Sequence, residues 1–84
     1  MKKEKVLNYT VIFEPQPEGG YTAIVPALPG CISEGDDLKE SRKMISDAIK
    51  GYCESLLKDK LPLPKDINIT PIKEKIKVKI SGLT

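Results

Sequence analysis

One amphipathic helix is the feature that most constrains how this chain folds. From Leu38 to Lys58, apolar residues recur at helical spacing, at Leu38, Ile45, Ala48, Ile49, Tyr52 and Leu56. Asp37 and Glu40 have the spacing of a capping box, so we expect the helix to begin just after Asp37. Ser41 and Arg42 occupy the expected positions between Leu38 and Ile45, and neither is apolar. A single helix with an apolar stripe must bury it against another layer, which the rest of the chain has to supply.

Three segments before the helix alternate between apolar and polar residues, as strands do. They are residues 5–14, 21–25 and 31–34. The loop Pro15–Gly20 separates the first two, which we predict to pair as an antiparallel hairpin. Pro29 and Gly30 form a turn signal between the second and third. The Pro- and Gly-rich stretch before the helix therefore needs no chemistry to explain it.

A fourth strand is predicted after the helix, at Lys73–Ile80, which reads KEKIKVKI. Its residues divide between an apolar face (Ile76, Val78, Ile80) and a lysine face (Lys75, Lys77, Lys79). The expected fold is therefore α+β: a single domain of residues 1–84 in the order β-β-β-α-β, a small mixed sheet with the helix packed on one face. If the last strand lies parallel to the first, the helix is a right-handed crossover.

Composition excludes several kinds of chemistry. The chain has no histidine, which removes Ser-His-Asp and Cys-His nucleophilic catalysis and imidazole metal ligands. Its two cysteines, Cys31 and Cys53, are expected to be free, buried thiols. Glu34, Asp36 and Asp37 could hold Mg²⁺, but they are sequential and Asp37 suits the helix cap, so cap and turn is the favoured role. We expect no catalytic residue, no metal and no cofactor.

Charge and hydropathy narrow the partners further. The net charge is +2, without the basic excess of a nucleic-acid-binding domain. No apolar run approaches the roughly 20 residues of a membrane span, and the N-terminus lacks the apolar region of a signal peptide. A cytoplasmic protein without membrane contact is expected. The lysine face of the last strand could follow a phosphate backbone or contact a protein, but solvated protection of a sheet edge is the favoured reading.

Several motifs together resemble the HicB-like antitoxin family. They are the acidic-glycine turn before an aromatic residue, the P-x-L-P-G-C element, the G-D cap before the helix and the proline-marked helix exit, here Glu18–Tyr21, Pro26–Cys31, Gly35–Asp37 and Leu61–Pro64. The resemblance spans about residues 9–66. It implies a truncated ribonuclease-H-like fold and assembly into homo-dimers or larger oligomers.

The same resemblance implies a non-enzymatic function. Members of this family bind and neutralise HicA-type toxins, small ribonucleases that cleave mRNA with a catalytic histidine, by covering the active surface of the toxin. Many also carry a C-terminal DNA-binding module. The sequence ends at Thr84, soon after the predicted fourth strand, so direct nucleic-acid binding is not expected. The alternative is a solitary homo-oligomeric scaffold or regulatory domain with no toxin partner.

Acidic residues at the start of the helix are the predicted partner-binding site. A toxin that binds RNA has a basic surface, so the surface of this chain that binds the toxin should be acidic. Glu34, Asp36, Asp37 and Glu40 supply such a patch. Met44 and Leu57 fall off the main helical stripe and are either ordinary surface residues or contacts to a second subunit.

Overall fold

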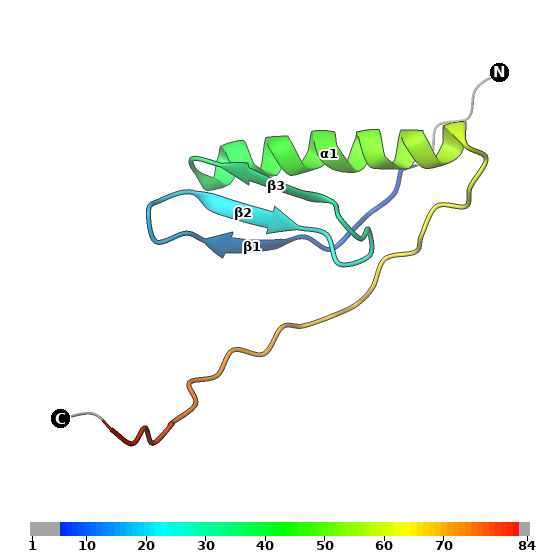
Figure 1. Ribbon diagram of the computed structural model, residues 1–84. Coiled ribbons are helices and arrows are strands. Elements are labelled where there is room, and N and C mark those ends of the chain that lie inside the picture. Colours follow the sequence, from blue (N-terminus) through cyan, green and yellow to red (C-terminus); the bar gives the residue numbers. More distant parts are fainter. Residues whose placement is uncertain (1–5, 83–84) are drawn as a thin grey trace.

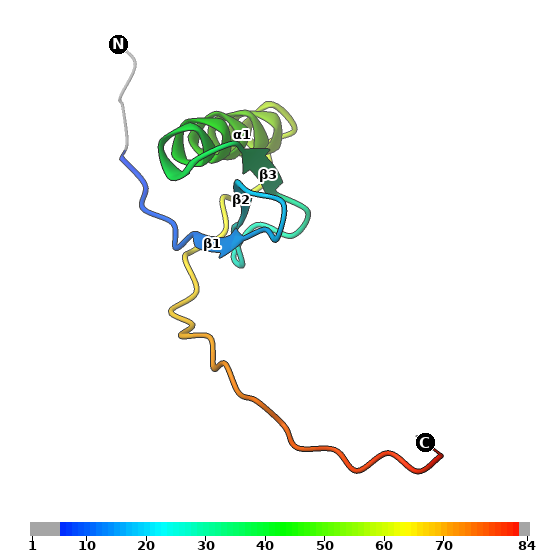
Figure 2. The ribbon, with the colours of Figure 1, turned by 90° about the vertical axis from the view of Figure 1, so that its left-hand side faces the viewer.

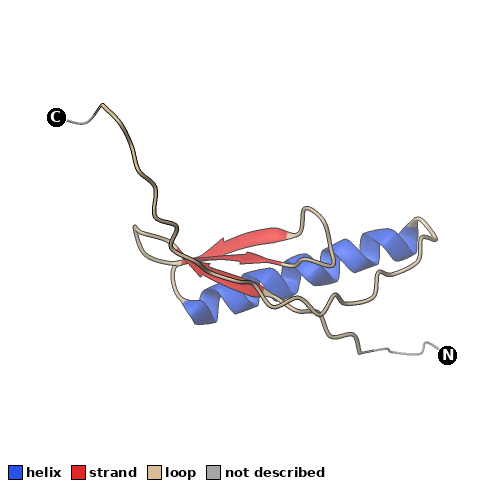
Figure 3. Ribbon diagram, turned by 90° about the horizontal axis from the view of Figure 1, so that it is seen from below, coloured by secondary structure: helices blue, strands red, loops and turns tan. Residues whose placement is uncertain are grey.

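The computed structural model describes residues 6–82 and contains one three-stranded sheet and one helix. The strands are β1 (Ile12–Pro15), β2 (Tyr21–Ile24) and β3 (Ile32–Gly35), and the helix is α1 (Leu38–Lys58). The sheet has the order β1-β2-β3 and both pairs are antiparallel. Figure 1 shows α1 beside β3, with β1 at the far edge of the sheet. Figure 3 shows the three strands as one layer against the helix.

The helix begins and ends where local signals place it. Asp37 is the N-cap, and its carboxylate accepts a hydrogen bond of 2.7 Å from the Glu40 N–H. At the other end, the Leu61 N–H donates to the Leu56 carbonyl and the Lys60 N–H donates to the Leu57 carbonyl. Lys60 has a left-handed φ of 59°. These two bonds form a Schellman motif, so the helix stops before the prolines at 62 and 64.

The core lies between α1 and one face of the sheet. The strand register places Phe13, Ala23 and Ser33 side by side, and Phe13 and Ala23 belong to the core cluster. From the helix, Ile45 and Cys53 are buried, and Ala48, Ile49 and Tyr52 pack against the cluster, as the helical stripe predicts. The opposite face of the sheet carries Ile12, Ile24 and Ile32 in register, and Ile32 is 56% exposed.

The loop between β2 and β3 is part of the core. It is closed by bonds from the Val25 N–H to the Cys31 carbonyl and from the Cys31 N–H to the Leu28 carbonyl. Leu28 is fully buried, and the Tyr52 hydroxyl on α1 donates to the Pro29 carbonyl at 3.0 Å. The predicted strand–turn–strand is confirmed. The deep burial of Leu28 is a tertiary feature that the turn signal alone does not give.

Helix and sheet meet in backbone contact at Gly35. A Cβ added there would lie 2.7 Å from the Ser41 Cα and still closer to the Ser41 nitrogen. Ser41 is fully buried, and its hydroxyl lies 3.4 Å from the Tyr21 carbonyl. Ser41 therefore packs at a position of the helical stripe although it is polar. A small side chain at 41 lets α1 approach the end of β3.

The first strand is shorter than predicted. Within residues 6–82, β1 begins at Ile12, whereas residues 6–11 belong to no strand. The reason is that β2 pairs Ile24 with Ile12, and the chain then turns into the 25–31 loop. No backbone remains there to pair with the earlier residues. Lys5, the first residue of the predicted strand, lies outside the described residues.

The predicted fourth strand does not form in the described part of the chain. Residues 61–82 contain no strand, so the sheet is antiparallel rather than mixed. After α1 the chain passes β1 and then separates from the domain (Figures 1 and 2). Three hydrogen bonds hold its first part: the Tyr9 hydroxyl donates to the Pro64 carbonyl, and the Thr10 N–H and hydroxyl donate to the Asp66 carboxylate. An alternating pattern makes a strand only where a free edge lies within reach, and this anchor carries Lys73–Ile80 past β1.

Candidate partner-binding site

An acidic hollow lies where the sheet meets the start of α1. Its volume is about 410 Å³, and it is lined by Gln16, Glu18, Gly19, Tyr21, Glu34, Gly35, Asp36 and Glu40. Four of these are carboxylates and none is a lysine or arginine. We use the name acidic hollow for the surface of Glu18, Glu34, Asp36 and Glu40.

Three elements bring these carboxylates together. Glu18 comes from the β1–β2 hairpin, Glu34 from β3, and Asp36 and Glu40 from the start of α1. The hairpin is closed by the Gln16 N–H to the Gly20 carbonyl at 3.0 Å. Gly20 has a φ of 82°, and a Cβ there would lie 2.5 Å from the Gly35 carbonyl oxygen. Glycine at 20 therefore allows both the turn and its close approach to the end of β3.

Asp37 and Glu40, at the start of α1, have different roles. The Asp37 carboxylate is occupied by the Glu40 N–H, and Asp37 does not line the hollow. The Glu40 carboxylate accepts from the Asp36 N–H at 2.8 Å, one residue before the N-cap, where a capping box would bond the N-cap itself. Glu40 therefore both braces the turn and lines the hollow, whereas Asp37 is committed to the helix.

The structure thus brings together three of the four predicted residues: Glu34, Asp36 and Glu40. Sequence reasoning missed Glu18, which lies sixteen positions before Glu34. The signal that could have found it is the register, since Tyr21 lies opposite Gly35 and so places the hairpin turn beside the end of β3. Their part in binding a partner stays a prediction.

The two cysteines are free and buried, as predicted. Burial, and secondarily the neighbouring Cys53, raise the pKa of the Cys31 thiol. The Cys53 sulfur lies 4.0 Å from the Tyr9 hydroxyl, within the core. A nucleophilic cysteine needs a lowered pKa, so this environment favours a packing role.

Neither a metal cluster nor a membrane helix occurs in the described part of the chain. Among residues 6–82, no three Cys, Asp or Glu side chains are placed to hold a metal ion together. Over the same residues, no helix has the length and apolar character to cross a bilayer. Lys75, Lys77 and Lys79 are exposed on the C-terminal segment and do not line the acidic hollow.

Comparison with known sequences gives the family. Residues 9–80 match the family described as the HicB-like antitoxin of bacterial toxin–antitoxin systems. The chain belongs to the HicB-like antitoxin family. The resemblance seen in the motifs around the hairpin and the helix is therefore confirmed over most of the chain.

Relatives of this HicB-like chain fall into two groups. It is 41% identical over 70 residues to the UPF0150 protein ssr1765 of Synechocystis, covering 82% of this chain and 89% of the relative. It is 43% identical over 60 residues to the UPF0150 protein Ta0767 of Thermoplasma acidophilum, covering 71% and 87%. It is 37% identical over 62 residues to Antitoxin HicB 1 of Photorhabdus laumondii, covering 71% of this chain but 40% of that protein.

Proposed function

We propose that this chain binds and neutralises a HicA-type, mRNA-cleaving toxin by covering the active surface of the toxin. The observation that supports this proposal is the acidic hollow, four carboxylates from three elements with no basic lining residue, on a member of the HicB-like antitoxin family. The chain would act by binding and not by catalysis, in the cytoplasm and as a homo-oligomer.

Charge complementarity is the physical basis of the proposal. A protein that cleaves mRNA must attract a phosphate backbone, so its RNA-binding surface is basic. Opposing potentials steer association and fix the orientation of a complex. Glu18, Glu34 and Asp36 have exposed side chains and would meet that basic surface. Binding there would exclude RNA from the same groups on the toxin.

Charge reversal in the hollow tests the proposal. The variant Glu34→Lys/Asp36→Lys should raise the Kd for a HicA-type toxin by at least about tenfold, which corresponds to ~1.4 kcal/mol. Calorimetric titration measures this change. Asp37 is left intact because loss of the cap would cost about 1 kcal/mol of helix stability.

The matched control is Asp47→Lys/Glu54→Lys. Both residues are exposed on α1 outside the hollow, and the pair changes the net charge by the same amount. The control should bind with a Kd near that of the unmodified chain. If both variants raised the Kd equally, the effect would come from net charge and not from the acidic hollow. If the Kd of Glu34→Lys/Asp36→Lys were unchanged, the acidic hollow would not be the binding site.

The alternative is a solitary homo-oligomeric scaffold or regulatory domain without a toxin. It is favoured by one observation: the two relatives matched over nearly their whole length carry only the name UPF0150 protein, whereas the match to Antitoxin HicB 1 covers 40% of that protein. The neighbouring reading frame distinguishes the two functions, because a HicA-type toxin would be a small basic protein that contains a histidine. If no such reading frame is present and no partner is recovered with the chain from the native host, the scaffold function is supported.

A further inference from the structure

The face of the sheet that points away from α1 carries a row of isoleucines. The register places Ile12, Ile24 and Ile32 side by side on this face, because their neighbour Ala23 points to the core and successive residues alternate. Ile32 is 56% exposed, and the other two are half-buried. Among the described residues α1 is the one helix, and it packs on the other face of the sheet. A contiguous apolar patch of this kind marks a contact surface.

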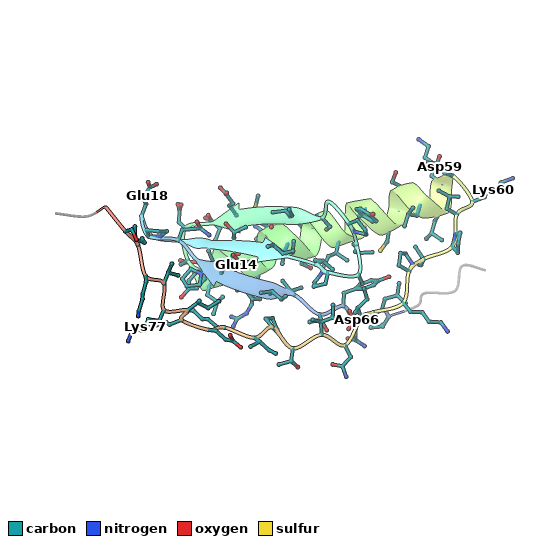
Figure 4. All side chains as sticks on the ribbon, turned by 60° about the horizontal axis from the view of Figure 1, so that its bottom comes forward. Glu14, Glu18, Asp59, Lys60, Asp66 and Lys77 are labelled. Carbon is teal, nitrogen blue, oxygen red and sulfur yellow. The ribbon has the colours of Figure 1, made fainter. Side chains whose placement is uncertain are left out.

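The described C-terminal residues lie at the β1 side of this face. Residues 71–73 share a groove with Ile12–Pro15, so they run along β1. Figure 4 shows the molecule with α1 behind the sheet, and the C-terminal segment passes beside β1 and crosses neither β2 nor β3. The part of the face that carries Ile24 and Ile32 is therefore left open by the described residues.

The next row of the same face is acidic and leads into the acidic hollow. Glu14, Thr22 and Glu34 lie side by side in this row, two residues along each strand from the isoleucines. Glu14 and Glu34 are exposed, and Glu34 also lines the acidic hollow. The apolar row and the acidic hollow are therefore parts of one continuous surface that joins at Glu34.

We propose that the open face of β2 and β3 is the apolar part of the toxin-binding surface, and that it receives apolar side chains that lie beside lysine or arginine residues on the toxin. This inference rests on the proposed function and adds a second contact to it. Protein interfaces have an apolar centre and a polar rim, and charge contributes more to the rate and orientation of association than to affinity. The acidic hollow supplies the charge, and Ile24 and Ile32 supply the apolar contact next to it.

Charge argues against a second copy of this chain as the occupant of the open face. Two copies that met through this face would each bring Glu14 and Glu34 to the contact, and like charges placed together at an interface are unfavourable. The lysine or arginine residues of a basic partner meet the same carboxylates favourably.

Removal of the exposed isoleucine tests this inference. Calorimetric titration with a HicA-type toxin should give a Kd about fivefold higher or more for Ile32→Thr, which keeps a β-branched side chain and loses much of the apolar contact. This increase should persist at high ionic strength, whereas the effect of Glu34→Lys/Asp36→Lys should shrink as salt screens the charges. The control Leu57→Gln removes an apolar side chain of matched exposure, 57%, near the far end of α1, and should leave the Kd unchanged.

Isotope-filtered NMR on the labelled chain bound to unlabelled toxin locates the contact without any substitution. The inference predicts contacts between the methyl groups of Ile24 and Ile32 and apolar side chains of the toxin. It is overturned if these contacts are absent from the complex. It is also overturned if the unmodified chain binds the toxin and Ile32→Thr has the same Kd, or if Leu57→Gln raises the Kd equally; the proposed function then stands.

Two other outcomes also overturn the inference. If the unmodified chain does not bind the toxin, the proposed function fails and the inference fails with it. If light scattering shows that the free chain is a dimer and that Ile32→Thr is a monomer, the open face binds a second copy and not the toxin.

Discussion

At Gly35 the backbone of β3 lies directly against the first turn of α1. The atoms that a Cβ would meet belong to the Ser41 backbone, which cannot rotate away as a side chain can. Ser41 is buried for the same reason, since a larger residue there would separate the helix from the strand. The junction also sets the geometry of the acidic hollow, because Glu34, Asp36 and Glu40 surround it.

Gly35→Ala is therefore expected to lower the free energy of unfolding. Overpacking of a tight contact costs about 1–3 kcal/mol, measurable as a lower midpoint of urea unfolding. The control is Gly51→Ala on α1, where a Cβ would have nothing within 4 Å. That change should raise the free energy of unfolding by about 0.5–1 kcal/mol, because alanine is the better helix former. Equal midpoints for the two variants would contradict the contact at Gly35.

At the scale of elements, the sequence predicts the features that depend on local signals and misses those that depend on tertiary contacts. The helix Leu38–Lys58 and its Asp37 cap were predicted correctly, since a cap and a helical stripe depend on neighbouring residues. The burial of Ser41 and Leu28 was not, because it depends on Gly35 and on the core that the 25–31 loop closes. Glu18 was missed for a similar reason, as its neighbours come from strand register.

The C-terminal strand illustrates the same division. KEKIKVKI has the alternation of a strand, but a strand must pair with the edge of a sheet. The hydrogen bonds from Thr10 to the Asp66 carboxylate determine which edge this segment can reach. The alternating pattern predicted a strand, and residues 73–80 form none in the described part of the chain, because the pattern carries no information about a partner edge. The prediction was also wrong for residues 6–11, which belong to no strand because the short β2 leaves them without a partner strand.

The anchor itself should depend on pH. Hydrogen bonds from the Thr10 N–H and then from its hydroxyl lower the pKa of Asp66 below its ordinary value of about 4. A lowered folded pKa means that the stabilisation is present at neutral pH and is lost as pH falls below about 4 and through the folded pKa. Acidification should therefore weaken the two hydrogen bonds between Thr10 and Asp66.

A carbon-13 NMR titration of the Asp66 carboxyl group measures this directly. Its midpoint should lie below about 4 in the unmodified chain. In Thr10→Val, which keeps the N–H and removes the hydroxyl donor, the midpoint should rise part of the way toward that value. Thr70→Val, in the exposed part of the same segment, serves as the control and should leave the midpoint unchanged. A midpoint of Asp66 at or above 4 in the unmodified chain would contradict the anchor.

At the scale of the whole molecule, the chain presents surfaces for contact and offers little for catalysis. It lacks histidine, both thiols are buried, and the carboxylates of the hollow face outward around the end of the sheet. The acidic hollow lies where the β1–β2 hairpin and the end of β3 meet the start of α1, and it is the surface at which we propose that a toxin binds. Membership of the HicB-like antitoxin family agrees with the proposed binding of a toxin.

Titration of a HicA-type toxin with this chain tests the proposed occlusion most directly. The rate of mRNA cleavage and the binding of uncleaved RNA by the toxin should fall together, both in proportion to the complex formed, and no RNA should be cleaved by the chain alone. Cleavage that continues at saturating chain, RNA that stays bound to the toxin within the complex, or cleavage by the chain itself would contradict occlusion.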